Sequence, residues 1–421
     1  MKTKRTKKSF RNQNRFVTAG ACLGLIVSGG MAACAQTTTD ADKMADMQKR
    51  LDSLEDLVKK EGLMASASTN AVLSAMDKIT ISGFVQASYF YNTQRPKGGE
   101  SATYLWNTKD NSFSMNKFKL TIASAPVQTD KWDAGFKASL LFGDDAPDLN
   151  TPGANGTGSN TSFNDLREAY IEINVPIGTG LDIKAGELIS LLNWESGDGG
   201  AANPNFSQGY QWWFTGNGPS AGIQGTYNFT DKIGLTMRVD NGLYQGPVDN
   251  NQGKAFSGSV NLKPTDKLWV NVIGWYDSQP GDSNTSGISS IGGYQFTKEF
   301  GTGYEVDYFH FAAPGSNTDL WSVGGWAWYN FTSKVGVSFR ADLISQDNGV
   351  IGPAVRPGPG TGILSTQDGG NLGSLTATLN LTPVPYIKIQ PEVRYDYTSY
   401  HDGLNGHSYQ FIIGCGATYM F

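Results

Sequence analysis

Apolar and polar residues alternate along most of the chain, and the alternation is clearest at its end. Over residues 408–421, every second side chain is apolar or aromatic, and these are Tyr409, Phe411, Ile413, Cys415, Ala417, Tyr419 and Phe421. Most of the side chains between them are small or polar. Because successive side chains of a strand point to opposite faces, this segment is predicted to be a strand with one apolar face.

The same two-residue period recurs from Ile79 onward and predicts sixteen strands. They cover residues 79–92, 112–126, 131–143, 163–175, 181–190, 220–230, 232–242, 252–264, 267–277, 287–297, 301–312, 318–331, 334–346, 370–382, 386–398 and 408–421. Short connections alternate with longer ones, most of which are rich in Gly, Asn, Asp and Pro: residues 93–111, 144–162, 191–219 and 347–369. Short periplasmic turns and longer outer loops are typical of transmembrane β-barrels.

This rhythm predicts an all-β fold, namely a transmembrane antiparallel β-barrel of about sixteen strands over residues 79–421. Fourteen or eighteen strands are alternatives, because strand boundaries are the least reliable part of such a prediction. A soluble β-sandwich would also alternate, but the short and long connections favour the barrel. A strand that ends on Phe421 resembles the closing strand of bacterial outer-membrane barrels. An even strand count places this end in the periplasm, where we expect the barrel-assembly machinery to recognise it.

Residues 1–35 have the features of a cleaved export signal. Residues 1–15 carry seven positive charges and no acidic residue, and an apolar run from Phe16 to Ala33 follows. Ala33-Cys34-Ala35 fits the small-x-small cleavage rule, so we expect the mature chain to begin at Gln36. Two alternatives are a retained membrane helix, which the glycines of this run make weakly apolar, and lipidation of Cys34.

Residues 36–78 are predicted to form a periplasmic segment made of a short helix and a linker. Within residues 40–62, apolar side chains follow the heptad spacing 3, 4, 3, 4: Met44, Met47, Leu51, Leu54 and Val58. The pattern fits a short coiled coil that helps a homotrimer assemble. It fits a solvated or docked amphipathic helix equally well, because so short a helix is marginal on its own.

Composition adds a negative charge and an abundance of glycine and aromatic residues. Loss of residues 1–35 would lower the number of basic residues from 33 to 26 and leave all 38 acidic ones, a formal net charge of −12. This balance argues against nucleic acid as a partner. The 52 Gly residues, with 21 Phe, 18 Tyr and 10 Trp, suit a barrel with glycine-rich turns and aromatic girdles.

A series of short motifs lies between residues 181 and 277. In order, they are Gly186-Glu187, Asn193-Trp194-Glu195, residues 222–227, Thr230-Asp231-Lys232, Asn241-Gly242, residues 249–254, Ser257-Gly258 and residues 264–268. The ordered set resembles the OmpL-like β-barrel porin family, and this resemblance implies an outer-membrane porin but no particular solute. The same motifs have a local explanation, since Asp231 and Asp266 suit tight turns.

Charged residues recur on the strand face that is predicted to line the lumen. Three segments carry an Arg and an Asp two positions apart: Arg238-x-Asp240, Arg340-x-Asp342 and Arg394-x-Asp396. Lys388 and Glu392 share the inward face of the third segment. Charged rings let a pore select solutes, whereas internal ion pairs would only brace the wall, and both interpretations stay open. We expect these eight residues to line the pore, with weak selectivity for cations.

The long connection at residues 191–219 is rich in aromatic side chains. A constriction formed by this loop would involve Trp194, Glu195, Tyr210, Trp212 and Trp213. Folded into the lumen, its rings would offer a stacking surface for sugars or apolar solutes. Placed at the outer rim, they would form an aromatic girdle. Such girdles are common in outer-membrane barrels, which favours the second interpretation.

The sequence predicts no catalytic, metal or cofactor site. The histidines show no arrangement of nucleophile and base with nearby serines, and they are His310, His401 and His407. The acidic run at residues 144–148 lacks the ligand spacing of a Ca²⁺ loop. We expect a porin in outer-membrane lipid that lets small polar solutes and ions diffuse through a water-filled barrel. A structural or adhesive barrel with a plugged lumen is the alternative.

Overall fold

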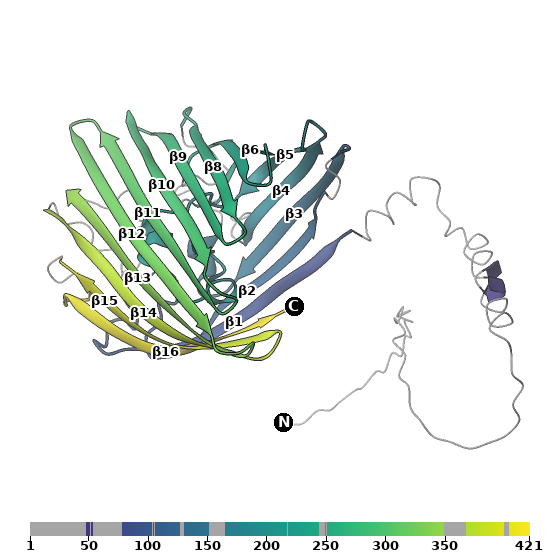
Figure 1. Ribbon diagram of the computed structural model, residues 1–421. Helices are drawn as coiled ribbons and strands as arrows, with labels where there is room; N and C mark the ends of the chain where they lie inside the picture. Colours follow the sequence, from purple (N-terminus) through teal and green to yellow (C-terminus); the bar gives the residue numbers. More distant parts are fainter. Residues whose placement is uncertain are drawn as a thin grey trace, which may run out of the picture. The chain divides into compact units, whose positions relative to one another are not determined.

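The computed structural model contains a barrel of sixteen strands (Figure 1). They are β1 (Thr80–Asn92), β2 (Ser112–Ser124), β3 (Asp133–Phe142), β4 (Leu166–Val175), β5 (Leu181–Leu188), β6 (Ser220–Asn228), β7 (Ile233–Asp240), β8 (Ala255–Thr265), β9 (Leu268–Gln279), β10 (Ser283–Gln295), β11 (Phe300–Ala313), β12 (Ser316–Asn330), β13 (Val335–Asn348), β14 (Asp368–Val384), β15 (Ile387–Thr398) and β16 (Tyr409–Met420). The structure describes residues 48–50, 52–53 and 78–421, except 103, 105, 127–129, 151–164, 217, 244–248, 250, 349–367 and 400–403.

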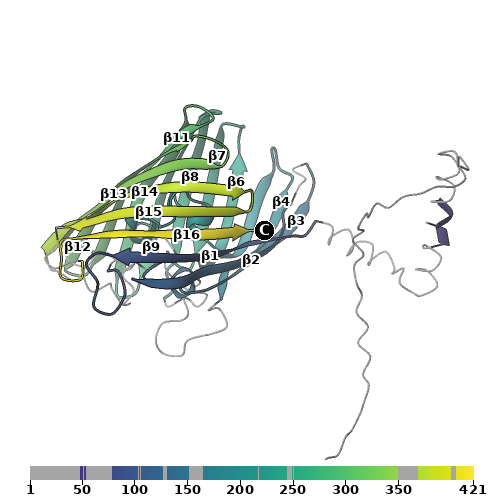
Figure 2. The same cartoon turned by 90° about the horizontal axis from the view of Figure 1, so that it is seen from below.

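Each strand pairs antiparallel with its neighbours in sequence, and β1 pairs with β16 to close the barrel (Figure 2). The closing ladder runs from Phe84 opposite Met420 to Asn92 opposite Ile412. Beyond it, the backbone groups of Gly83 and Phe421 exchange two hydrogen bonds of 2.9 and 3.0 Å. Closure leaves no strand edge unpaired, which removes the usual site of edge-to-edge aggregation.

The predicted fold is confirmed, since each of the sixteen predicted segments contains one strand. The sandwich and the counts of fourteen and eighteen strands are wrong. The largest boundary difference concerns β10, which begins at Ser283 instead of residue 287. Gly281 and Asp282 have positive φ angles of 72° and 58°, so the turn is tight and the β9–β10 ladder extends as far as Gln279 opposite Ser283.

Side chains alternate between the two faces of the wall as the sequence pattern requires. On β7, Met237 is 56% exposed, whereas Thr236 and Arg238 on either side are 5% and 4% exposed. The outer face is therefore apolar and faces lipid, and the polar residues project into the barrel.

Aromatic side chains gather at the strand ends next to the short turns. Tyr294 packs against Phe296 with ring centroids 4.6 Å apart, and Tyr329 packs against Phe331 at 5.2 Å. These rings are exposed on the outer face. Such a belt is typical of the membrane–water interface, so this end of the barrel has an aromatic girdle.

Four of the short turns are closed by a threonine hydroxyl. The Oγ1 atom of Thr332 accepts the backbone N–H groups of Lys334 and Val335, both at 3.1 Å. Equivalent pairs of hydrogen bonds are made by three other threonines: Thr230, Thr265 and Thr297. Asp231 and Asp266, which suit tight turns, directly follow two of these threonines. Each threonine hydroxyl lies within reach of two backbone N–H groups and accepts both.

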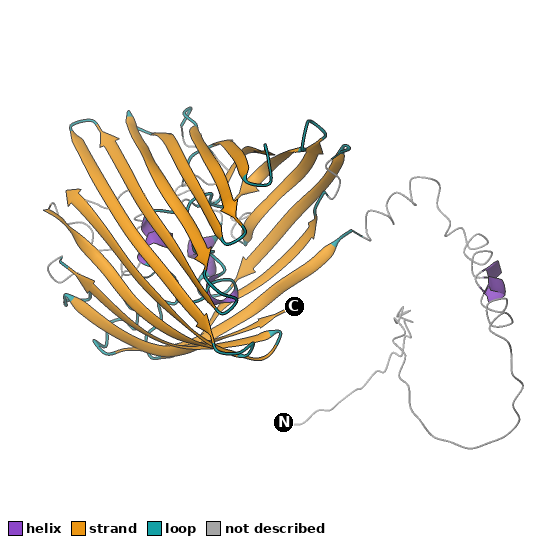
Figure 3. Ribbon diagram, viewed as in Figure 1, coloured by secondary structure: helices purple, strands orange, loops and turns teal. Residues whose placement is uncertain are grey.

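Short helical segments from the connections lie inside the ring of strands (Figure 3). The connection between β5 and β6 contains η2 (Gly199–Ala201) and α4 (Tyr210–Phe214), and α3 (Ala146–Leu149) lies between β3 and β4. Helix α4 contacts β12, β13 and β14, and η2 contacts β16. Residues of the β5–β6 connection therefore lie against the far wall of the barrel.

The N-terminal part of the chain forms a separate unit over residues 1–72. Residues 48–50 and 52–53 are helical. The predicted signal over residues 1–35, Cys34 and the rest of the predicted helix over residues 40–62 lie outside the described residues. In the part of the chain that the structure describes, no helix combines the length and apolar character needed to cross a membrane.

Candidate functional site in the barrel lumen

The structure places all eight predicted lumen residues on the inward face of the wall. Seven of them are at most 4% exposed, and Lys388 is half-buried. In a barrel with an empty lumen, these side chains would be hydrated. Six of them are hydrogen-bonded to the β5–β6 connection, residues 189–219, which we call the inner loop. The other two, Asp240 and Asp396, accept hydrogen bonds from elsewhere.

Each Arg-x-Asp repeat brings its own two side chains together. Arg394 Nε lies 2.7 Å from Asp396 Oδ1, and Arg340 Nε lies 3.3 Å from Asp342 Oδ1. In the repeat on β7, the shortest distance between the Arg238 guanidinium and the Asp240 carboxylate is 4.0 Å. Residues two apart on a strand share a face, which explains why the spacing brings them together.

All three arginines also donate to backbone carbonyl groups of the inner loop. Arg238 Nη2 lies 2.8 Å from the oxygen of Ile189, where the loop begins. Arg340 Nη1 donates to Ser207 over 2.6 Å. Arg394 Nη1 donates to the carbonyl group of Gln208, also over 2.6 Å. The repeats that the sequence presents as a charged lumen wall therefore hold one loop at three places.

Carboxylates on the wall accept the N–H groups of the same loop. Glu392 accepts the backbone N–H groups of Phe206 and Ser207 at 2.8 and 3.2 Å. Asp342 accepts that of Tyr210 at 2.9 Å. A loop inside a barrel buries backbone groups that a strand ladder does not satisfy, and these carboxylates supply the missing partners.

Glu305 and Asp307, two inward residues of β11, hold the loop in the same way. Glu305 accepts the backbone N–H of Trp194 at 2.8 Å. Asp307 accepts hydrogen bonds from the side chains of Gln211 at 3.2 Å and Thr215 at 2.9 Å. The anchoring groups thus extend over β7, β11, β13 and β15.

The loop contributes one carboxylate of its own, Glu195, to this network. Its Oε1 atom lies 3.0 Å from both Arg340 Nη1 and Trp326 Nε1, and Oε2 accepts the N–H of Gly209 at 2.6 Å. Lys388 completes the network by donating to carbonyl groups near η2. Glu195 is 4% exposed, so it is a structural partner of Arg340.

Two inward glycines of the wall provide space for aromatic side chains of the loop. A Cβ atom at Gly416 would lie 1.9 Å from Phe206 Cε2, and one at Gly303 would lie 2.3 Å from Trp194 Cε2. A side chain at either position would therefore overlap with an aromatic ring. These glycines fit the loop closely against β16 and β11.

The predicted aromatic residues of the loop pack inside the barrel. Tyr210 is fully buried, and Trp194 stacks on Trp326 with ring centroids 4.5 Å apart. Trp212 meets Trp106 edge to face at 5.3 Å. The outer-rim girdle that the sequence favoured does not describe these residues, because their partners are inward side chains and another loop. The side chain of Trp213 lies outside the described residues.

A second loop, residues 93–111 between β1 and β2, also enters the barrel, and the sequence analysis missed it. The Arg394 guanidinium contacts the rings of Tyr104 and Tyr210, 4.4 and 4.8 Å from their centroids. Tyr104 Oη donates to Asp396 over 2.6 Å. Burial raises the pKa of the Tyr104 phenol well above its usual range, so it stays a donor. In the sequence, this loop is marked by a cluster of apolar and aromatic residues among polar ones, namely Ala102, Tyr104, Leu105 and Trp106.

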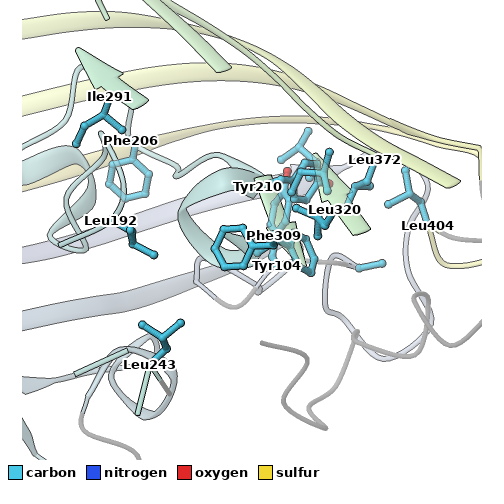
Figure 4. Packing of buried hydrophobic residues seen from close by; sticks show 14 of the residues in the cluster. Tyr104, Leu192, Phe206, Tyr210, Leu243, Ile291, Phe309, Leu320, Leu372 and Leu404 are labelled. Atoms are coloured by element: carbon cyan, nitrogen blue, oxygen red, sulfur yellow. The ribbon is translucent and has the colours of Figure 1, made fainter. Parts of the chain in front are cut away.

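The two loops and the wall form an apolar cluster inside the barrel (Figure 4). It includes Tyr104, Phe206, Tyr210, Leu243 and Leu404 from the connections. Inward residues of the strands complete it, among them Phe309, Leu320, Ile344, Leu372 and Ile412. The side of the lumen next to β9–β16 is therefore filled by packed side chains.

A cavity of about 400 Å³ lies on the opposite side, between the inner loop and strands β2–β4. Lys119 and Lys137 line it from the wall, and Asp198 lines it from the loop. Lys119 Nζ lies 2.9 Å from Asp198 Oδ1. Burial would raise the pKa of the Asp198 carboxyl, but Lys119 and Arg167 bring it below its usual value. The cavity is therefore a space in the lumen beside the inner loop.

A comparison with protein families shows to which family the barrel belongs. Residues 78–421 match the family described as "Putative beta-barrel porin-2, OmpL-like". Among proteins of curated function, no sequence matches the chain significantly.

Solved structures with the same architecture are outer-membrane proteins. The outer membrane channel DcaP of Acinetobacter baumannii has a TM-score of 0.55 at 13% identity, over 82% of this chain and 97% of that one. The anion-selective porin from Comamonas acidovorans has a TM-score of 0.53 at 11% identity, over 82% of this chain and 99% of that one. The trimer form of OmpT of Vibrio cholerae has a TM-score of 0.53 at 9% identity, also over 82% of this chain and 99% of that one. At such identities, the likeness shows the fold alone. Because the family match spans most of the sequence, this chain belongs to the OmpL-like beta-barrel porin family.

Proposed function

We propose that this porin conducts small polar solutes and ions beside its inner loop, through the space between that loop and strands β2–β4. The observation that carries the proposal is the position of the loop, which is fixed to β7, β11, β13 and β15 and leaves the cavity on the other side. Family and fold indicate a channel in the outer membrane rather than an enzyme.

The eight predicted lumen residues act in this proposal by shaping the passage. Six of them form hydrogen bonds to the inner loop, and Lys119 on β2 pairs with its Asp198. Together these contacts fix the position of the loop and so determine the width of the remaining space. Residues that line the cavity, such as Lys119 and Asp198, then control the charge selectivity directly. We retain the expectation of weak selectivity for cations from the acidic composition of the chain.

Export and assembly form a second part of the proposal. The basic and apolar character of residues 1–35 supports a cleaved signal, and Phe421 supports recognition by the barrel-assembly machinery. A homotrimer is supported by the heptad spacing within residues 40–62 and by the trimer form of the similar OmpT.

A structural or adhesive barrel with a plugged lumen is the second candidate. The observation in its favour is the contact between two connections, in which Tyr104 of one loop and Tyr210 of the other both lie against Arg394. Loops joined in this way would block solutes if they also closed the space beside β2–β4.

Single-channel recordings separate the two candidates. Residues 36–421 would be refolded and inserted into planar bilayers with a salt gradient across them. Stable ohmic steps are expected for a porin, and their reversal potential reports charge preference. A heat-modifiable, folded barrel that carries no current would establish the plugged lumen instead.

A further inference from the structure

The cavity between the inner loop and strands β2–β4 has the size and lining of a binding site. Its volume of about 400 Å³ lies within the range of pockets that bind small organic molecules. Lys119, Lys137 and Glu168 line it from three adjacent strands, and Asp198 and Trp212 line it from the inner loop.

Four of the seven charged residues that line the cavity form a row of ion pairs, and the other three are Asp148, Arg167 and Glu195. Lys119 Nζ lies 2.9 Å from Asp198 Oδ1 and 3.9 Å from Glu168 Oε1. Lys137 Nζ lies 2.8 Å from the same oxygen of Glu168. The row therefore alternates in sign, with two ammonium groups and two carboxylates. A charged solute would meet both signs within a few ångströms, so this row favours neither a cation nor an anion.

The two ends of the row are open to a solute. The side chain of Lys137 is 30% exposed and that of Asp198 is 26% exposed, whereas Glu168 is almost completely buried. An ammonium group offers only hydrogen-bond donors and a carboxylate only acceptors, so the open ends present both kinds. Trp212 adds an aromatic side chain to the same lining.

A sugar matches this combination better than an ion or a zwitterion does. Each hydroxyl both donates and accepts, so neighbouring hydroxyls can bind the ammonium and the carboxylate without adding charge. The C–H faces of a sugar ring can pack against an indole. An amino acid would need two separated charges without partners, whereas Lys119 and Lys137 already have carboxylate partners.

We propose that this cavity binds a neutral polyhydroxylated solute, of the size of a monosaccharide or disaccharide, during its passage through the barrel. The inference rests on the proposed porin function and specifies the class of its solute. Asp198 and Lys137 bind hydroxyl groups, and Trp212 packs against the ring.

The test is a titration of single-channel current with glucose and with maltose, at constant salt. In the unmodified protein, at least one of the two sugars is expected to reduce the current to a plateau at low concentration. Asp198→Asn should weaken that saturable effect by about tenfold or more, since a hydrogen bond to a charged group is lost. Asp249→Asn is the matched control, because Asp249 pairs with Lys254 outside the cavity.

Glycine, which is zwitterionic, and glycerol, which lacks a ring, would be titrated in parallel. Current that falls only in proportion to solution viscosity for every solute would overturn the inference and leave the porin function intact. A saturable effect of glycine without one of either sugar would also overturn it.

A binding measurement in detergent keeps the inference testable in a protein without current. Tryptophan fluorescence of the refolded chain would be titrated with the same sugars. A saturable change that Asp198→Asn weakens would support the site even if no conductance is observed. In that case the porin proposal alone would fail. If neither sugar changes the fluorescence and neither affects the current, the proposed binding site would be ruled out.

Discussion

Arg394 shows how one buried side chain can join three segments of the chain. Its guanidinium forms an ion pair with Asp396, donates to the carbonyl of Gln208 and lies near the rings of Tyr104 and Tyr210. A buried charge needs compensating partners, and here a strand and the inner loop supply hydrogen bonds while both loops supply aromatic rings. The repeat Arg-x-Asp is visible in the sequence, but the identity of these partners is not.

Replacing Arg394 by Met should therefore release both loops. The change leaves Asp396 buried without its cation, and we expect a loss of about 3–5 kcal/mol in the free energy of unfolding. Heat-modifiability on gels and current noise in bilayers would report the loss. Lys109→Met is the control, because Lys109 pairs with Glu100 in a partly exposed position and should change stability by less than about 1 kcal/mol. Equal stability of the two variants would contradict the anchoring role.

Gly416 gives a second prediction for a single residue. Gly416→Ala puts a methyl group into the space occupied by the Phe206 ring, so the ring must move at a cost of about 1–3 kcal/mol. The inner loop should then become sensitive to chymotrypsin, which cleaves after aromatic residues. In the control Gly325→Ala, the new methyl group has no atom nearer than 4.0 Å. Equal rates of cleavage would show that the close fit at β16 does not hold the loop.

Among the elements, the strands could be predicted from the sequence and the inner loop could not. A strand depends on alternation within about a dozen residues, and every predicted strand is present. The position of the loop depends on contacts between distant residues, such as the ion pair between Glu195 and Arg340. The glycines that receive its aromatic rings, Gly303 and Gly416, look like ordinary strand glycines in the sequence. An aromatic stretch in a loop fits both a position inside the lumen and a girdle at the rim, so it does not separate the two.

The short turns offer a prediction at the scale of elements. Thr332→Val removes the hydroxyl that accepts the N–H groups of Lys334 and Val335. Water can replace it at this exposed site, so we expect a loss of at most about 1 kcal/mol in the free energy of unfolding. Denaturant unfolding of detergent-refolded protein would measure it. Thr332→Ser, which keeps the hydroxyl, should restore most of the loss, and failure of this rescue would contradict the assignment.

For the whole molecule, the barrel and its interior filling are separate layers of structure. The ladder between β5 and β6 runs from Leu181 opposite Tyr227 to Leu188 opposite Ser220, without any residue of the loop between them. The wall therefore has its own hydrogen bonds. The filling depends on polar contacts with the wall, which water could replace in a hydrated lumen.

Replacing residues 192–216 by a Gly/Ser linker of equal length should thus keep the barrel and open its lumen. We expect an unchanged β-sheet circular dichroism spectrum and a single-channel conductance several-fold higher than that of the unmodified protein. Unaltered conductance in a correctly folded variant would mean that another segment sets the narrowest section, and residues 93–111 would be the first to examine.

The seam between β1 and β16 has a consequence for the order of events in folding. Gln86 on one strand donates to Thr418 on the other, across a sequence separation of 332 residues. The other ladders join neighbours in sequence, so they can form as hairpins, whereas the seam must wait for the ends of the sheet to meet. Until then, both edges are free to pair with other chains. Substitutions along β1 and β16 should therefore reduce the yield of assembled protein more than they reduce the stability of barrels that have already closed.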